Sequence, residues 1–150
     1  MPCAVRFLLV LVTVSRTARE LMHKDTVTVP AQESLLEVLH LLVVAGVSGL
    51  PVVGRDGAIV GVLSSTDVLA AIEQACDADR DEDEPEDVRE SLQAITAGEI
   101  ATPEVIWVSP DTTVAEVSRI MRAEGIHRVL VGTSEKLEGV LTAFDLLRAI

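Results

Sequence analysis

The sequence has 150 residues, 49% of them hydrophobic, and carries a formal net charge of −12 at pH 7. That length and composition suffice for one compact domain or for two small repeats that share a core. The negative charge and the scarcity of aromatic residues argue against nucleic-acid binding, which requires basic and stacking side chains.

The N-terminal segment 1–16 contains an eight-residue apolar run over 7–14. A membrane-spanning helix needs about 20 apolar residues, so this run is too short to cross a bilayer. It has a weak similarity to a signal peptide, but no A-x-A cleavage site follows it. We expect an extra strand or a tail ordered by a neighbour. The two cysteines form neither a disulfide framework nor a zinc site, which favours a reduced, cytoplasmic protein.

The remainder of the sequence contains an internal repeat. Segments 20–53 and 99–132 align at an offset of 79 residues, and the offset becomes 78 after a one-residue deletion in a predicted turn. The segment GVLSSTDVLAAI (61–72) then matches GVLTAFDLLRAI (139–150). Two copies of one supersecondary unit are therefore expected. Each copy of about 50 residues buries too little surface to be stable alone, so the copies should pack face to face.

Each repeat predicts the element order β-α-β-β-α. The first helix begins near residues with N-capping side chains and ends at a glycine, Gly46 or Gly125, that can adopt the left-handed C′ conformation. Apolar and β-branched runs bounded by polar turns indicate the strands. The predicted elements are strands 26–29, 50–53 and 59–64 with helices from 34 and from about 67, and strands 105–108, 128–131 and 137–142 with helices from 113 and from about 145.

Residues 77–96 form an acidic linker and helix between repeat 1 (17–76) and repeat 2 (97–150). Residues 77–90 hold nine acidic side chains and two arginines, a pattern typical of a solvated loop. A cation-binding loop is the alternative, but the glycine and regular acidic spacing of an EF-hand are missing. Helical periodicity resumes over 91–100.

The ordered segments GVSGLPVVGRDGAIVGVLSSTDVL and GIHRVLVGTSEKLEGVLTAFDLL follow ELMHKDTVTVP and EIATPEVIWVSP, respectively. This ordered set resembles tandem CBS (cystathionine β-synthase) domains, which pair into a Bateman module. Repeat 2 departs from the family pattern at Leu130, which replaces the proline that repeat 1 has as Pro51. It implies an α+β fold of two β-α-β-β-α repeats packed with pseudo-two-fold symmetry.

A hydroxyl and an aspartate recur at the last strand-to-helix junction, as Ser64 with Asp67 and as Thr142 with Asp145. The S/T-x-x-D spacing is that of a capping box, which is a structural role. The same groups also suit a ligand, because a helix N-terminus attracts phosphate and a carboxylate accepts ribose hydroxyls. Both interpretations stay open at the level of the sequence.

The resemblance implies an adenosyl ligand at these junctions. Repeat 2 has His127 and Arg128 where repeat 1 has Ser48 and Gly49. Because Arg128, and His127 when protonated, can bind phosphate, we expect AMP, ADP or ATP to bind more tightly beside Asp145. Trp107 is interpreted as a packing residue, and His23 and His40 as isolated. The predicted ligand-binding residues are Val27, Thr28, Ser48, Gly49, Leu50, Ser64 and Asp67 in repeat 1, and Ile106, Trp107, His127, Arg128, Val129, Thr142 and Asp145 in repeat 2.

No catalytic or metal-binding constellation is evident in the sequence, so we expect a regulatory sensor that signals to a protein partner rather than an enzyme. A dimerisation module without a ligand is the alternative. The first helix carries Leu39 and Val43 where its repeat-2 counterpart has Ser118 and Arg122. This apolar stripe predicts a homodimer interface, as the resemblance also implies, or a surface covered by segment 7–14.

Overall fold

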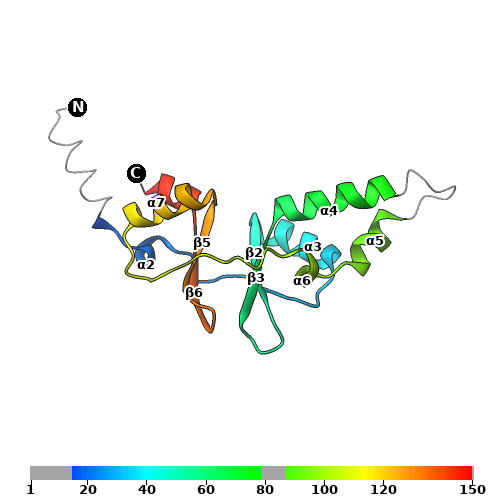
Figure 1. Cartoon of the computed structure of the whole chain (residues 1–150), viewed down its shortest axis with the longest axis horizontal. Coiled ribbons are helices and arrows are strands. Elements are labelled where there is room, and N and C mark those ends of the chain that lie inside the picture. The colour runs from blue at the N-terminus through cyan, green and yellow to red at the C-terminus, as the bar shows by residue number, and fades with distance from the viewer. Residues whose placement is uncertain (1–14, 79–86, 150) are drawn as a thin grey trace. The chain divides into compact units, whose positions relative to one another are not determined.

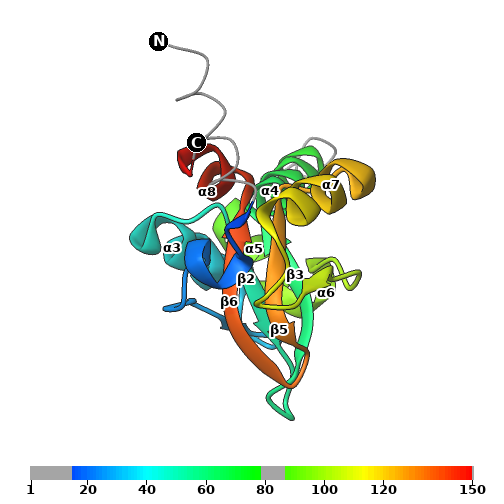
Figure 2. The same ribbon diagram turned by 90° about the vertical axis from the view of Figure 1, so that its left-hand side faces the viewer.

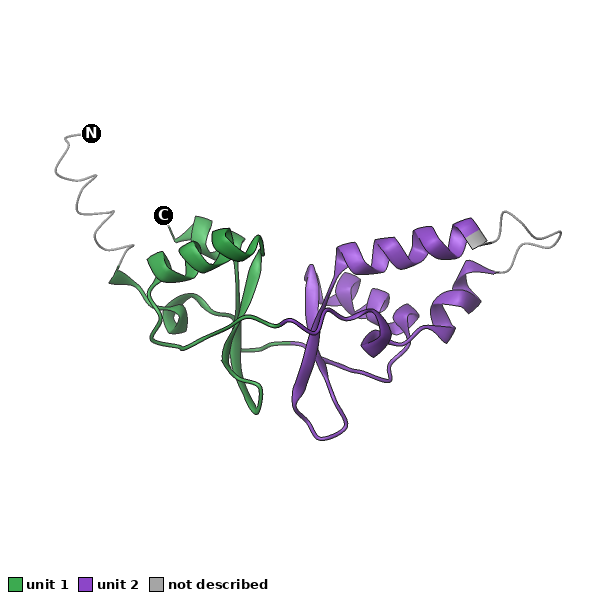
Figure 3. Cartoon of the chain, in the orientation of Figure 1, with its two compact units in different colours: residues 1–26, 105–150 green, residues 27–104 purple. Residues whose placement is uncertain are grey.

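The computed structural model describes residues 15–78 and 87–149 (Figure 1). They divide into two compact units, coloured separately in Figure 3. Unit 1 contains described residues 15–26 and 105–149, and unit 2 contains residues 27–78 and 87–104. The predicted N-terminal strand or tail over 7–14 and most of the acidic loop lie outside the described residues.

Unit 2 is a three-stranded sheet with helices packed on it. Strand β2 pairs in parallel with β1 and antiparallel with β3, so the strand order is β1-β2-β3. Helices α3, α4 and α5 contact one another, and α6 contacts β1 and β3. The elements are β1 (Val29–Pro30), α3 (Leu35–Ala45), β2 (Gly49–Val53), β3 (Ile59–Ser64), α4 (Ser65–Ala78), α5 (Val88–Ala94) and α6 (Ala97–Ile100).

Unit 1 repeats this design with the order β4-β5-β6 and the same parallel and antiparallel pairings. Figure 2 shows α7 and α8 near one end of the β5–β6 hairpin, with the hairpin turn at the other end. The elements are α2 (Ala18–Leu21), β4 (Trp107–Val108), α7 (Val114–Glu124), β5 (Arg128–Thr133), β6 (Lys136–Thr142) and α8 (Ala143–Arg148). The two sheets with their helices confirm the predicted α+β class with two repeats.

The caps of the long helices confirm the sequence signals. Ser34 and Thr113 cap α3 and α7 by accepting hydrogen bonds from the backbone N–H groups of Glu37 and Glu116. Gly46 and Gly125 end the same helices with φ of 64° and 65°, in the left-handed region that favours glycine.

Several predicted boundaries differ from the structure. The first strand of each repeat is shorter than expected, because only two residues of β1 and of β4 pair with the neighbouring strand. Helix α5 begins at Val88, inside the expected loop, because the Asp87 side chain accepts a hydrogen bond from the Arg89 N–H. Within 91–100, extended Ile95 separates α5 from the short helix α6.

The compact units do not coincide with the sequence repeats. Helix α2 belongs to repeat 1 in sequence but contacts β6 of repeat 2, and α6 belongs to repeat 2 but contacts β3 of repeat 1. After α2, His23 exchanges two backbone hydrogen bonds with Val140, and after α6, Thr102 exchanges two with Val62. Each repeat therefore contributes its first residues to the unit built mainly by the other repeat.

Candidate functional site

The repeated hydroxyl and aspartate form the same hydrogen-bonded ring in both units. The Oδ2 atom of Asp67 accepts the Ser64 backbone N–H at 2.7 Å and the Ser64 hydroxyl at 2.6 Å. The Oδ2 atom of Asp145 accepts the same two groups of Thr142 at 2.8 and 2.7 Å. Each aspartate N–H donates back to the hydroxyl oxygen, at 3.3 and 3.4 Å. These rings are capping boxes, so the capping interpretation is confirmed.

The ring limits what the two hydroxyls can offer a ligand. A hydroxyl has one hydrogen to donate, and Ser64 and Thr142 each donate it to their aspartate. While the ring is formed, neither hydroxyl has a hydrogen left for a phosphate. Attraction for a phosphate in this part of unit 1 therefore depends on backbone N–H groups and on positively charged side chains such as Arg128. The aspartates retain a second oxygen, Oδ1, which can accept hydroxyl groups.

Asp145 is nearly buried, with 8% of its surface exposed, and its Oδ1 atom lies 2.8 Å from Nε2 of His23. Because a carboxylate only accepts, the imidazole is the donor. Burial acts to raise the pKa of Asp145, but hydrogen bonds from the Thr142 N–H, the Thr142 hydroxyl and then His23 outweigh it and hold this pKa below its ordinary value.

The contact between His23 and Asp145 corrects the sequence interpretation of His23 as isolated. The two residues are 122 positions apart, so no local spacing connects them. The available signal was the alignment of the repeats, which places His23 opposite Thr102 in the segment before each first strand. The imidazole reaches the carboxylate only because the first residues of each repeat pack in the unit built mainly by the other repeat.

The strand ends gather most of the other predicted residues around each aspartate. In unit 1, Arg128 pairs with Thr142 across β5 and β6, the His127 carbonyl accepts the Ala143 N–H at 2.8 Å, and the Ile106 carbonyl accepts the Leu130 N–H at 3.0 Å. Residues 106–107, 127–128 and 142–145 therefore lie at one end of the sheet, opposite the hairpin turn.

Unit 2 arranges its predicted residues in the same way. Gly49 pairs with Ser64 across β2 and β3, and the Ser48 carbonyl accepts the Ser65 N–H at 2.9 Å. The departure at Pro51 has a structural consequence, because proline has no N–H with which to reproduce the bond that Leu130 makes to Ile106. Residues 27–28, which correspond to 106–107, precede β1 at the same end of this sheet.

The predicted residues range from buried to exposed. Leu50 and Val129 are each 1% exposed and belong to the hydrophobic cores of their units, so only their backbone could face a ligand. Trp107 is half-buried. The exposed members are Val27, Thr28, Ser48 and His127.

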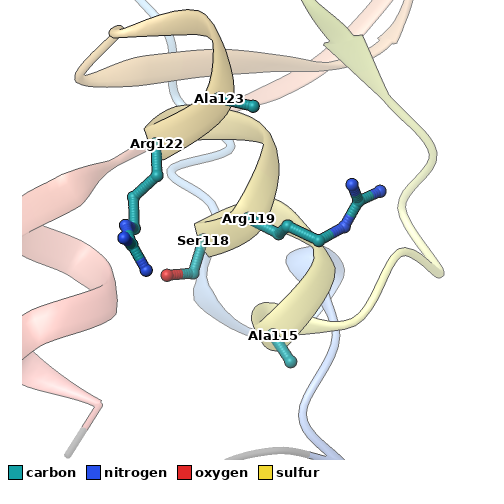
Figure 4. A pocket seen from close by; sticks show the side chains of 5 residues that line it. All are labelled: Ala115, Ser118, Arg119, Arg122 and Ala123. Atoms are coloured by element: carbon teal, nitrogen blue, oxygen red, sulfur yellow. The ribbon is translucent and has the colours of Figure 1, made fainter.

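Sequence reasoning missed an exposed aromatic beside Asp145. Phe144 in α8 is 71% exposed, and the matching position of α4 holds Thr66. The separate groove in Figure 4 lies on the outer face of α7 and shares no residue with the predicted sites. Its lining residues are Ala115, Ser118, Arg119, Arg122 and Ala123.

Two absences hold for residues 15–78 and 87–149, the part of the chain that the structure describes. No cluster of three or more His, Cys, Asp or Glu side chains within them could hold a metal ion. No helix among them is long and apolar enough to cross a membrane.

Comparison with known proteins identifies the repeats. The family model described as CBS domain matches residues 18–74 and 97–150. The gamma-3 subunit of 5'-AMP-activated protein kinase from Sus scrofa is 32% identical over 129 residues, which are 85% of this chain and 24% of that protein. The chain spans 39% and 23% of the length of two further curated relatives.

Solved structures share the fold over nearly the whole chain. The CBS domain of a CBS domain containing membrane protein from Sphaerobacter thermophilus superposes with a TM-score of 0.79 at 25% identity, covering 98% of this chain and 95% of that one. CBSX2, solved in complex with AMP, superposes with a TM-score of 0.69 at 26% identity, covering 89% and 94%.

Proposed function

Because the chain belongs to the CBS domain family, we propose that it is a regulatory module that binds an adenosyl nucleotide of the AMP, ADP or ATP type. Binding changes the orientation of parts of the module, and this change signals to a protein partner. The role is regulatory rather than catalytic. A ligand can shift such an equilibrium only by the difference between its affinities for the two states.

One observation carries the proposal: a partly or largely buried aspartate stands at the same strand end in both units, held by its own capping box. The box fixes Oδ2 and the orientation of the carboxylate, so that Oδ1 is the atom that would accept ribose hydroxyls, in unit 1 beside the imidazole of His23. CBSX2, which has the same fold at 26% identity, was solved with AMP, and this supports an adenosyl ligand here.

The charge of the two sites supports a difference between them. Unit 1 has His127 and Arg128 where unit 2 has Ser48 and Gly49. An arginine adds a positive charge and bidentate hydrogen bonds to phosphate, and neither Ser48 nor Gly49 carries a charge. We therefore retain the prediction that anionic nucleotides are drawn more strongly to unit 1.

Binding can be tested with thermal unfolding and isothermal titration of AMP, ADP and ATP against the full chain. A ligand at about 100 times its Kd adds about 2.7 kcal/mol, which raises the Tm of a chain of this size by about 5–10 °C. We expect Asp67→Asn and Asp145→Asn each to abolish binding in one unit, and the double variant to lose the Tm rise.

Asp56→Asn is the matched control, because Asp56 is an exposed carboxylate in the β2–β3 turn of unit 2. It should leave the nucleotide response unchanged. A wild-type protein that gives no shift with any of the three nucleotides contradicts the proposal. So does a double variant that responds as strongly as the wild type.

An assembly module without a ligand is the second candidate, favoured by exposed apolar residues. On and after α3, Val43, Val44 and Val47 are 73%, 69% and 40% exposed. Contiguous exposed apolar side chains indicate an interaction surface. This candidate predicts an oligomer whose Tm does not respond to nucleotides, so the same thermal experiment distinguishes the two.

A further inference from the structure

The two carboxylates of the proposed sites differ in one contact. In unit 1, Oδ2 of Asp145 accepts both donors of Thr142, and Oδ1 accepts the imidazole of His23 at 2.8 Å. Both oxygens are therefore engaged by the protein. A ribose that needs both acceptor sites of Oδ1 for its two hydroxyls has to compete with His23, which already takes one of them.

Unit 2 provides an internal comparison for this contact. Thr102 occupies the position of His23, because its backbone pairs with Val62 as that of His23 pairs with Val140. Asp67 makes the same ring with Ser64. Among the described residues, no side chain donates a hydrogen bond to its Oδ1 atom. Oδ1 of Asp145 in unit 1 therefore accepts a hydrogen bond from His23, and Oδ1 of Asp67 in unit 2 has no equivalent donor among the described residues.

The backbone of His23 is fixed, but its side chain can leave Asp145. Its backbone is held by hydrogen bonds of 2.9 and 3.0 Å with Val140, and Gly139 lets it approach so closely that an added Cβ would lie 2.7 Å from the His23 carbonyl oxygen. Its side chain is 63% exposed. A change of side-chain rotamer can thus release Asp145 without moving the backbone, and exposed rotamers change within nanoseconds.

We propose that His23 is an affinity-determining residue of the unit 1 site: it competes with the ligand for Asp145, and it competes more strongly when protonated. The inference rests on the proposed function, since it assumes that Asp145 accepts the ribose. Histidine changes its charge between pH 5 and 8, and an imidazolium held by a carboxylate, with both partners charged, binds it more strongly than a neutral imidazole does. Protonation of His23 therefore lowers the affinity of unit 1 for AMP as the pH falls. This effect opposes the attraction between Arg128 and the AMP phosphate.

The elements that carry or contact the pair bear other charged groups. Of these, His127 is the second histidine near the site, and the AMP phosphate itself changes its charge near pH 6. Both contribute equally to a protein with His23 and to one without it, so the comparison of the two cancels them. The groups are Arg19 and Glu20 on α2, Lys24 and Asp25 after it, Lys136 and Glu138 on β6, His127 and Arg128 at β5, and Arg148 on α8.

The test is isothermal titration of AMP against the full chain at pH 8 and pH 6. An Asp67→Asn background silences unit 2, and His23→Thr introduces the residue that unit 2 itself carries at this position. We expect His23→Thr to tighten AMP binding about three-fold at pH 8 and about ten-fold at pH 6, as expected for the loss of a carboxylate hydrogen bond from a neutral and from a protonated imidazole at an exposed position. His40→Thr removes an exposed histidine from α3 and should have no effect.

The reciprocal substitution tests whether a histidine at this position is enough to weaken AMP binding. In an Asp145→Asn background, Thr102→His places an imidazole beside Asp67, and AMP binding in unit 2 should weaken, more so at pH 6 than at pH 8. Thermal unfolding without AMP confirms that each variant is folded. AMP affinity that His23→Thr leaves unchanged or reduces at both pH values overturns the role of His23 while the proposed function stands. Absence of AMP binding by the wild-type protein and every variant overturns both.

Discussion

At the residue scale, Asp145 combines a structural and a chemical role in one side chain. It closes the capping box of α8 through Oδ2 and presents Oδ1 to His23. Because it is 8% exposed, its charge is compensated by hydrogen bonds rather than by water. The hydrogen bonds that stabilise the ionised form make the folded state sensitive to acid.

The lowered pKa of Asp145 predicts a pH-dependent loss of stability. A carboxyl whose pKa is lower in the folded state stabilises it fully above the unfolded pKa, about 3.9, and loses that contribution as pH falls through the folded value. We expect Asp145→Asn to lower the free energy of unfolding by roughly 1–2 kcal/mol at pH 7. Urea unfolding should show this difference shrinking below about pH 4.

Asp67→Asn is the matched control in unit 2. It removes the same carboxylate from the same ring but no histidine contact, so its cost at pH 7 should be smaller. A difference between Asp145→Asn and the wild type that stays constant from pH 7 to pH 3 would contradict this account.

The candidate site shows which residues local sequence could identify. The spacing of Thr142 and Asp145 is three residues, so both the capping box and the carboxylate could be predicted from the repeat. His23 could not be placed, because its partner is 122 residues away and its contact depends on pairing with β6. Leu50 and Val129 were predicted beside the ligand, but the alternation of β2 and β5 directs their side chains into the cores.

At the element scale, the glycine that opens each repeated motif has a packing role. Gly61 in β3 and Gly139 in β6 are buried where the segment after α6 or α2 crosses the strand. A Cβ on Gly61 would lie 2.8 Å from the Thr102 carbonyl oxygen, and one on Gly139 would lie 2.8 Å from Sδ of Met22. Only glycine allows the crossing segment to pair with the strand.

We expect Gly139→Ala to destabilise unit 1 by about 1–3 kcal/mol, the usual cost of overpacking a close contact. The added methyl group has to displace the backbone of His23 and so weaken its hydrogen bonds to Val140. Urea unfolding measures the loss, and hydrogen exchange at the Val140 amide should report faster opening.

Gly61→Ala should produce an equivalent effect in unit 2, with faster exchange at the Val62 amide. Wild-type stability and unchanged exchange in both variants would show that the crossing segments are not held against the strands in solution.

The short helix α2 was not predicted, and α6 was predicted only as the end of one helical segment over 91–100, although a signal for each was present. Thr17 with Glu20 and Thr96 with Glu99 have the T-x-x-E spacing of a capping box, and both boxes form. Each helix has only four residues, too few for the apolar periodicity from which the longer helices were predicted.

At the scale of the whole molecule, self-association remains a prediction, and the structure changes which residues carry it. Val43 is 73% exposed on α3, whereas Leu39 is partly buried against the core of unit 2. Val44 adds a second side chain that is 69% exposed. The proposed homodimer interface therefore centres on Val43 and Val44, with Leu39 at its base.

We expect sedimentation velocity of the wild-type chain to show a dimer and of Leu39→Glu/Val43→Arg to show a monomer, because buried charges at an apolar interface are costly. Since Leu39 also packs on the core, Val43→Arg/Val44→Glu provides a variant that leaves the core intact. Arg122→Ala on the exposed face of α7 is the control and should remain dimeric. A monomeric wild type at high concentration would rule the interface out.

The sequence by itself determined the elements and their order, since strand patterns, N-caps and C-terminal glycines act over a few residues and were present twice. Gly46 and Gly125 end their helices as predicted because a left-handed residue is a local requirement. The tertiary structure decided which elements belong together: α2 packs on β6 and α6 on β3, across the repeat boundary. Pairing of a segment with a distant strand depends on complementary surfaces rather than on spacing, and this pairing placed His23 on Asp145.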